Sequence, residues 1–301
     1  MIITTATIQA LQTSFDSSFR AGWSDSALST PAYSTVVPST VRTNTYGWMA
    51  RLPAMRQWVG ARVIQNLTNY DYTLTNLPYE LTIGVDRDDI ADDQLGVYSP
   101  LFEELGRAAR RLQDDRVIDA LVAGTVDNGF DATPFFDNAH PALGVGAAID
   151  NLFAGTALTA ANYAAVRAAM SAYQGEDGNP LGVQPNLLVV PPQLEGVART
   201  ILNAEIIATA AGTAAETNIW RNSASLIVEP RLAAAPTVWY MMDVSHAIKP
   251  LIWQNRRTPQ LVSMASETDT NVFLDRQFMW GVDGRGAAGY GPFFLAARCA
   301  A

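Results

Sequence analysis

The chain has 301 residues, of which 49% are hydrophobic, and it carries a formal net charge of −9 at pH 7. This content can fill a sizeable core and excludes a disordered chain, while the acidic balance argues against a protein that grips nucleic acid through a basic surface. Cys299 is the only cysteine, which excludes an internal disulfide, and no apolar run approaches the roughly 20 residues of a membrane span.

The first 44 residues predict a short helix followed by an extended segment. Ile8, Leu11, Phe15 and Phe19 fall three or four positions apart, which is the spacing of an amphipathic helix. No basic stretch precedes these apolar residues, so we expect a soluble intracellular product without a signal peptide. Residues 22–44 are rich in Ser, Thr and Pro and are expected to lie extended against another surface.

Two strands are predicted next, at residues 61–67 and 79–85, joined by a stretch whose Asn, Asp and Pro residues supply turns. Leu81, Ile83 and Val85 alternate with small or polar residues, so one face of the second strand is expected to be buried. The pair predicts a long hairpin-like excursion.

Five aspartates fall within eight positions after this strand: Asp86, Asp88, Asp89, Asp92 and Asp93. Hard cations need several carboxylate oxygens, so a metal-dependent hydrolase that uses this cluster is an alternative function. The alternation of a calcium-binding loop breaks at Ile90, however, and no glycine follows for its sharp turn. Arg87 lies inside the cluster and can neutralise two carboxylates, which favours a solvated or interface-paired strand end.

A long helix is predicted from Ser99 to about residue 123. Ser99 can cap free amides, Pro100 tolerates the first helical position, and Gly124 is a plausible stop. At 1.5 Å per residue such a helix is about 36 Å long.

The remainder predicts two more helices and several short strands, which is the mixed order of an α+β domain. The helices are expected at 159–174 and 192–207, with a buried strand at 185–192. For the last third we expect antiparallel strands, at 225–230, 237–242, 250–255, 260–266, 271–282 and 292–299.

Other chemical patterns give no support for catalysis. A zinc site would have to combine His140 and His246, the only histidines, with a distant carboxylate, and His140 precedes a proline in a predicted turn. Residues 284–289, GRGAAG, match the dinucleotide fingerprint, but no helix follows, so we expect a turn between two strands. There is no G-x-S-x-G motif and no phosphate-cradling loop, so no catalytic residue and no cofactor is expected.

Four segments in order resemble the major head subunits of Mu-like phages and prophages: residues 46–67, 79–109, 135–141 and 186–202. These subunits belong to the wider group of tailed-phage capsid proteins with the HK97-like fold. The resemblance covers nearly the whole chain and is most specific from Trp58 to Gly96.

The resemblance implies an α+β fold with an N-terminal arm, an extended loop hairpin, a peripheral domain with a long spine helix, and an axial domain with a central antiparallel or mixed sheet. An arm and a loop without cores of their own are expected to be covered by neighbouring copies. Carried onto this chain, the parts are the arm at 1–44, the loop at 45–85, the peripheral domain at 86–151 with its spine helix at about 99–123, the axial domain at 152–246, the peripheral return strands at 247–285 and the axial return at 286–301.

The resemblance further implies a major capsid protein, not an enzyme, which assembles with itself into hexamers and pentamers of an icosahedral shell around double-stranded DNA, first as a procapsid. The expected partners are scaffold or protease, portal and, in some shells, decoration proteins. The packaged DNA is expected to make only weak non-specific contacts, and no membrane is involved. Assembly is expected in the host bacterial cytoplasm and the product in the virion capsid. Another ring- or tube-forming phage structural protein is a further alternative.

In this fold the acidic cluster falls where the loop rejoins the spine helix, close to subunit boundaries. We expect its aspartates to pair with arginines of an adjacent copy, which sets the register of the contact. The candidate contact residues are Arg51, Arg56, Arg62, Asp86, Arg87, Asp88, Asp89, Asp92 and Asp93. Related capsids that form a covalent lysine to asparagine bond need a lysine on the loop, whereas the only lysine here, Lys249, is on a predicted peripheral strand. A non-covalent shell is therefore expected.

Overall fold

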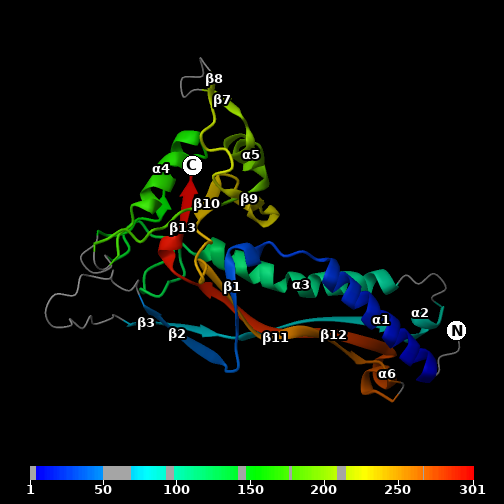
Figure 1. Ribbon diagram of the computed structural model, residues 1–301. Coiled ribbons are helices and arrows are strands. Elements are labelled where there is room, and N and C mark those ends of the chain that lie inside the picture. The colour runs from blue at the N-terminus through cyan, green and yellow to red at the C-terminus, as the bar shows by residue number, and fades with distance from the viewer. Residues whose placement is uncertain are drawn as a thin grey trace.

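The computed structural model describes residues 5–49, 69–92, 98–141, 147–175, 178–208, 215–266 and 268–301. Figure 1 shows an elongated lower part built on a four-stranded sheet and a wedge-shaped upper part built on a five-stranded sheet. Short 3-10 turns lie at Thr30–Ala32, Pro192–Leu194, Pro230–Ala234 and Phe293–Leu295. Within the described residues, no helix has both the length and the apolar character needed to cross a membrane.

The four-stranded sheet brings together strands from both ends of the chain, in the order β1 (Ser34–Pro38), β11 (Leu251–Met264), β12 (Gln277–Tyr290) and β4 (Leu77–Asp86). β1 runs parallel to β11, and the other neighbours are antiparallel. Buried and more exposed residues alternate along β12 from position 277 to 286, because successive side chains point to opposite faces. One face therefore packs under helices, and no described helix covers the other.

The helix predicted from Ser99 to about residue 123 is α3 (Tyr98–Ala123), which runs along the covered face of this sheet. It buries Phe102, Leu105 and Val117 among other residues on one side. Its opposite side carries charged residues that pair with one another, such as Arg107 with Glu103 at 2.5 Å. The apolar stripe seen in the sequence is thus the stripe that faces the core.

The helix predicted near the start is α1 (Thr5–Asp25), and it packs on α3 and β12 of its own chain. Phe15 stacks on Phe102 with ring centroids 4.0 Å apart, and both rings meet Trp280 edge-on. Further along, β1 pairs with β11, so the extended segment also lies against its own chain. The expectation that the arm lacks a core of its own is therefore wrong for its described part, because its aromatic stripe is buried intramolecularly.

The root of the predicted loop is an antiparallel pair, β2 (Thr43–Met49) and β3 (Asn69–Thr75). The strand predicted at 61–67 lies outside the described residues. The stretch at 68–78, predicted to supply turns, instead contains β3. This strand forms because of contacts with distant parts of the chain. Tyr72 and Leu74 share one strand face, Leu74 is buried, and the backbone N–H of Tyr290 donates to Tyr72 Oη at 3.2 Å.

The five-stranded sheet has the order β5 (Leu152–Phe153), β13 (Ala296–Ala300), β10 (Val238–Met242), β6 (Leu187–Val190) and β9 (Ser225–Val228). Every residue of β6 and β10 is buried. The sheet is mixed, since β5 and β9 join in parallel, so the antiparallel expectation holds only for its central strands.

Two helices accompany this sheet: α4 (Ala160–Ser171) and α5 (Glu195–Asn203). α5 ends earlier than predicted, and the following residues form β7 (Ile206–Ala208), which pairs with β8 (Ala215–Thr217). Figure 1 shows this small pair at the far end of the upper part.

Two local predictions in the last third are wrong. Residues 284–289 lie inside β12 and not in a turn, because close packing requires glycine there: a Cβ on Gly286 would lie 2.7 Å from Gln254 O. The start of the strand predicted at 271–282 is instead a helix, α6 (Thr270–Asp275), which ends where Arg276 adopts the left-handed conformation with φ of 55°.

Candidate functional site

Four of the five clustered aspartates lie at the distal end of the four-stranded sheet. α2 (Arg87–Asp92) follows β4 directly, and Asp86 Oδ1 accepts a hydrogen bond from the backbone N–H of Asp88 at 2.8 Å. A carboxylate oxygen of Asp88 lies 3.6 Å from Arg87 and another lies 3.6 Å from Arg276. Asp89 and Asp92 are exposed. Asp93 lies outside the described residues.

α6 lies beside α2, because the backbone N–H of Arg87 donates to the carbonyl of Arg276 at 2.9 Å. α6 adds Asp275, and Asp269 lies at its N-terminus. We call α2, α6 and the flanking Asp86, Asp269 and Arg276 the acidic tip. Its six aspartates and two arginines give a formal charge of −4.

The geometry of the acidic tip does not favour a metal centre. Asp86 and Asp88 already have backbone and guanidinium partners. In the part of the chain that the structure describes, no group of three or more His, Cys, Asp or Glu side chains is arranged to hold a metal ion. The exposed carboxylates are better suited to pairing with cations on another protein surface.

The predicted partners Arg51, Arg56 and Arg62 lie outside the described residues, so their pairing with the aspartates stays a prediction. The root of their loop is described, and it is fixed firmly on the four-stranded sheet. Tyr46 Oη donates to Oε1 of the fully buried Gln254 at 2.6 Å. The loop therefore leaves from a defined position.

A polar junction, which no sequence pattern indicated, connects the arm, α3 and the upper part. Asp114 of α3 accepts hydrogen bonds from the backbone N–H of Ser29 at 2.9 Å and of Thr30 at 3.2 Å. Ser29 Oγ donates to Oε2 of the buried Glu229 at 2.9 Å. Burial, with Glu229 nearby, raises the pKa of Tyr33 beside this junction well above its usual value. The partners are 85 and 200 residues apart in sequence, which is why local patterns miss them.

His140 is fully buried, and both of its ring nitrogens have partners. Nδ1 lies 2.6 Å from Asp131 Oδ2, and Nε2 lies 3.2 Å from Asn151 Oδ1. The ring also stacks on Phe293 with centroids 3.9 Å apart. The residue therefore connects segments of the core, which is a wider structural role than the turn expected from the sequence.

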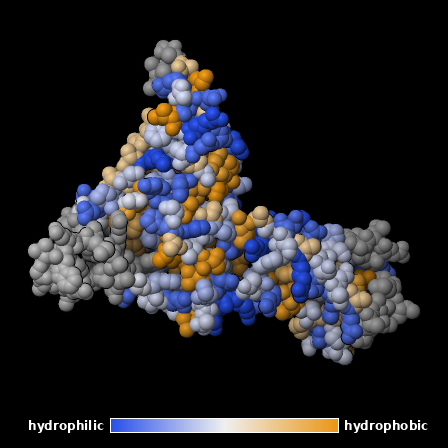
Figure 2. Space-filling view, viewed as in Figure 1, coloured by the Kyte–Doolittle hydropathy of each residue, from blue (hydrophilic) through white to orange (hydrophobic). Residues whose placement is uncertain are grey.

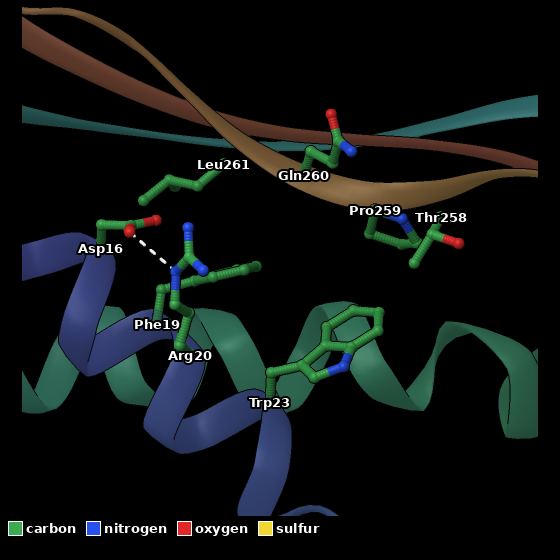
Figure 3. Close-up of a pocket in the computed structure, with 8 residues that line it drawn as sticks. All are labelled: Asp16, Phe19, Arg20, Trp23, Thr258, Pro259, Gln260 and Leu261. Carbon is green, nitrogen blue, oxygen red and sulfur yellow. Dashed lines mark hydrogen bonds and ion pairs between the residues drawn. The ribbon is translucent and has the colours of Figure 1, made fainter.

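A groove of about 480 Å³ lies between α1 and β11 (Figure 3). The Trp23 ring extends toward Pro259, and Arg20 forms an ion pair with Asp16 at 2.8 Å. The other polar side chains in its lining are those of Thr258 and Gln260, a set with no histidine or cysteine. The groove is a gap beside the docked arm helix and offers no catalytic arrangement.

The surface on the face shown in Figure 2 carries several separate apolar patches among hydrophilic residues. Large apolar side chains are also exposed at the distal end of the four-stranded sheet, including Val262 at 55%, Met264 at 51% and Phe273 at 83%. Monomeric proteins rarely expose such a cluster of apolar side chains. Clusters of this kind are typical of surfaces that another protein covers.

Comparison with protein families gives a match over nearly the whole chain. The family model described as Mu-like prophage major head subunit gpT matches residues 8–156, 151–232 and 233–300. The major capsid protein of Escherichia phage Mu is 30% identical over 296 residues, which cover 98% of this chain and 74% of that protein. The Mu-like prophage FluMu major head subunit of Haemophilus influenzae is 29% identical over 294 residues, covering 98% and 73%.

Solved structures give the same answer for the fold. A subunit of the procapsid of bacteriophage JBD30 is 31% identical, with a TM-score of 0.60, and the match covers 99% of this chain and 76% of that chain. The similarity thus extends through both sheets and the arm.

Proposed function

Because the chain belongs to the Mu-like prophage major head subunit gpT family, we propose that its copies form hexamers and pentamers of an icosahedral shell that encloses double-stranded DNA. The chain is a phage major capsid protein, and its α+β fold is the HK97-like capsid fold. The observation that supports the proposal best is the family match through residues 8–300, because it includes both sheets.

Exposed apolar side chains in the described part of the chain support self-association. Val262 and Met264, on the open face of the four-stranded sheet, are 55% and 51% exposed, and Phe273 of α6 is 83% exposed. Neighbouring copies in a closed shell would cover such surface.

For the parts of the subunit we keep the assignment made from the sequence, with the lower part as the peripheral domain and the upper part as the axial domain, except that β12 runs to Tyr290, so the axial return begins after this residue and not at 286. α3 then serves as the spine helix, and β2 with β3 forms the root of the extended loop. β4 belongs physically with the peripheral return strands, because it pairs with β12 along its whole length.

We also propose a purely structural role for the subunit, without a catalytic residue. The hydrolase alternative has no support, because the matching relatives are head and capsid subunits and the acidic tip is not arranged as a metal centre. A different ring- or tube-forming phage protein is not favoured for the same reason. Scaffold or protease, portal and decoration proteins remain proposed partners, with assembly in the host cytoplasm.

A non-covalent shell is consistent with the position of the only lysine. Lys249 lies just before β11, and its Nζ donates to the carbonyl of Pro31 at 2.5 Å in its own chain. This amine is therefore engaged inside the subunit. We propose that burial of surface between copies holds the shell together.

The full-length chain, expressed alone and together with a scaffold protein from a Mu-like phage, tests the proposal. Sedimentation and electron microscopy should show closed particles with five-fold and six-fold clusters of subunits. A chain that stays monomeric at every protein and salt concentration, with and without scaffold, would contradict it.

A further inference from the structure

The acidic tip carries two strongly exposed large apolar side chains. Phe273 and Leu274 of α6 are 83% and 67% exposed. Asp89, Asp92 and Asp275 surround this helix pair with exposed negative charge. An apolar centre with a charged rim is the usual composition of a surface that binds another protein.

A surface of opposite charge lies at the root of the loop. Asn76 is buried there, and its Nδ2 donates to Ser39 Oγ at 2.9 Å and to the carbonyl of Val41 at 2.9 Å. The guanidinium of Arg256 donates to the carbonyl of Ser39 at 3.3 Å, and Arg285 Nε donates to the carbonyl of Asn76 at 3.4 Å. These bonds hold both arginines against two adjacent segments, the connection between β1 and β2 at residues 39–42 and the junction of β3 and β4 at Asn76.

Arg42 lies in the first of these segments and is tied to the second, because its carbonyl accepts a hydrogen bond from the backbone N–H of Asn76 at 2.9 Å. Val41 and Leu77 beside it are 51% and 53% exposed. We call Arg42, Arg256, Arg285, Val41 and Leu77 the basic elbow. Among the described residues, none of its three arginines is ion-paired with a carboxylate, whereas the neighbouring Arg257 pairs with Asp283.

The tip and the elbow of one chain cannot meet. Arg285 lies opposite Pro78 in the sheet, while Gln277 at the tip lies opposite Asp86. The eight residue steps from Gln277 to Arg285 along β12 span about 27 Å at ~3.4 Å per residue. This separation exceeds the reach of a side-chain pair and the Debye length of about 8 Å at physiological salt.

We infer that the acidic tip of one copy docks on the basic elbow of a second copy. Phe273 and Leu274 then cover Val41 and Leu77, while Asp89, Asp92 and Asp275 face Arg42 and Arg256. This inference rests on the proposed shell function and specifies one of its contacts. Since the two surfaces differ, the contact is head-to-tail, and repetition of it generates a ring when the rotation closes. In this inference the aspartates pair with arginines at the root of the loop, and not with Arg51, Arg56 or Arg62 of the loop itself.

A charge exchange in the full-length chain tests the contact. The variant with Asp89→Arg and Asp92→Arg, and the variant with Arg42→Asp and Arg256→Asp, should each lower the yield of particles about tenfold or more, because like charges then face each other. Combining all four substitutions should restore particles to near the wild-type yield. Arg199→Asp on α5, an exposed position outside both surfaces, is the matched control and should assemble normally.

A cysteine pair locates the contact independently. Cys299 is buried, and burial raises the pKa of its thiol, so it gives little background reaction. Mixing a Phe273→Cys chain with a Leu77→Cys chain during assembly should give a disulfide-linked dimer that neither variant forms alone. A Phe273→Cys chain that links to itself would overturn the inference, because it would place two tips together.

The inference would also be overturned if Arg51→Asp restored assembly of the Asp89→Arg, Asp92→Arg variant while Arg42→Asp with Arg256→Asp did not. So would normal assembly of both reversed variants, while the shell proposal would stand. If the unmodified chain forms no particles with or without scaffold, both proposals fail. Circular dichroism and thermal unfolding of each unassembled variant separate loss of contact from loss of folding.

Discussion

The two sheets of this subunit obtain their stability in different ways. In the five-stranded sheet, β6 and β10 are buried at every position, so side chains on both faces contribute to one core. In the four-stranded sheet, β12 buries every second residue from 278 to 286, and the open face carries Val262 and Met264 at about half exposure. The five-stranded sheet thus folds around its own interior, while the four-stranded sheet keeps one face exposed, which the proposed shell would cover with other copies.

Two methionines measure this difference most directly. Met241 in β10 is fully buried, whereas Met264 in β11 is 51% exposed. Met241→Ala should lower the free energy of unfolding by about 2–5 kcal/mol, because it leaves a cavity in a packed core. Met264→Ala should change it by about 0.5 kcal/mol or less. Urea unfolding of the unassembled chain checks both values, and equal losses would show that the peripheral face is also internally packed.

The covered face of the peripheral sheet can be tested through the contact of α1 with α3. A Cβ on Gly106 would lie 2.1 Å from the carbonyl oxygen of Phe19, so Gly106→Ala must push the two helices apart. We expect a loss of about 1–3 kcal/mol from this overpacking. Hydrogen exchange in α1 should rise at the same time.

Gly196 in α5 is the matched control, because a Cβ there would meet no atom within 4 Å. Gly196→Ala should stabilise the chain by about 0.5–1 kcal/mol through the better helix propensity of alanine. An unchanged stability in Gly106→Ala would contradict the intramolecular docking of the arm helix.

A smaller effect is expected from pH at the loop root, where the peripheral sheet meets the loop. Burial raises the pKa of Tyr72 from 10.0 to about 12. Below pH 10 this tyrosine is neutral in the folded and the unfolded chain, so stability does not change. Between pH 10 and about 12 only the unfolded chain loses the proton, so stability falls as pH rises, by about 1.4 kcal/mol per pH unit for one tyrosine.

Tyr72→Phe removes this contribution. Between pH 10 and 12, the free energy of unfolding should fall less steeply with pH in the variant than in the wild type. The difference in slope should be about 1.4 kcal/mol per pH unit, the contribution of one tyrosine. Identical slopes would mean that Tyr72 is not buried in the folded chain.

Local sequence patterns predicted the elements whose periodicity matches their burial. The stripe of α3 and the short apolar run of β6 are examples, because each depends on residues that are close in sequence. The elements that the sequence missed depend on distant partners. β3 is a strand because Leu74 packs where only Gly289 leaves room, since a Cβ on this glycine would lie 2.2 Å from the Leu74 side chain.

The acidic cluster was evident in the sequence, but its neighbours were not. α6 reads as the start of a strand in the sequence, and only the fold places it beside α2. The arginines of the basic elbow lie at positions 42, 256 and 285, so no window of sequence contains them together. Resemblance to a family supplied the architecture, whereas the charge complementarity between the two surfaces required the three-dimensional arrangement.

The pairing of early strands with late ones also affects when the subunit becomes competent to assemble. β4 ends at Asp86, and β12, the one strand that pairs with it within the described residues, ends at Tyr290. At ~5–20 residues per second, a ribosome needs roughly 10 to 40 s to pass from one strand to the other. During that interval the nascent chain cannot present a finished peripheral sheet to its neighbours. For the proposed shell, translation itself therefore delays growth until a nearly complete polypeptide is available.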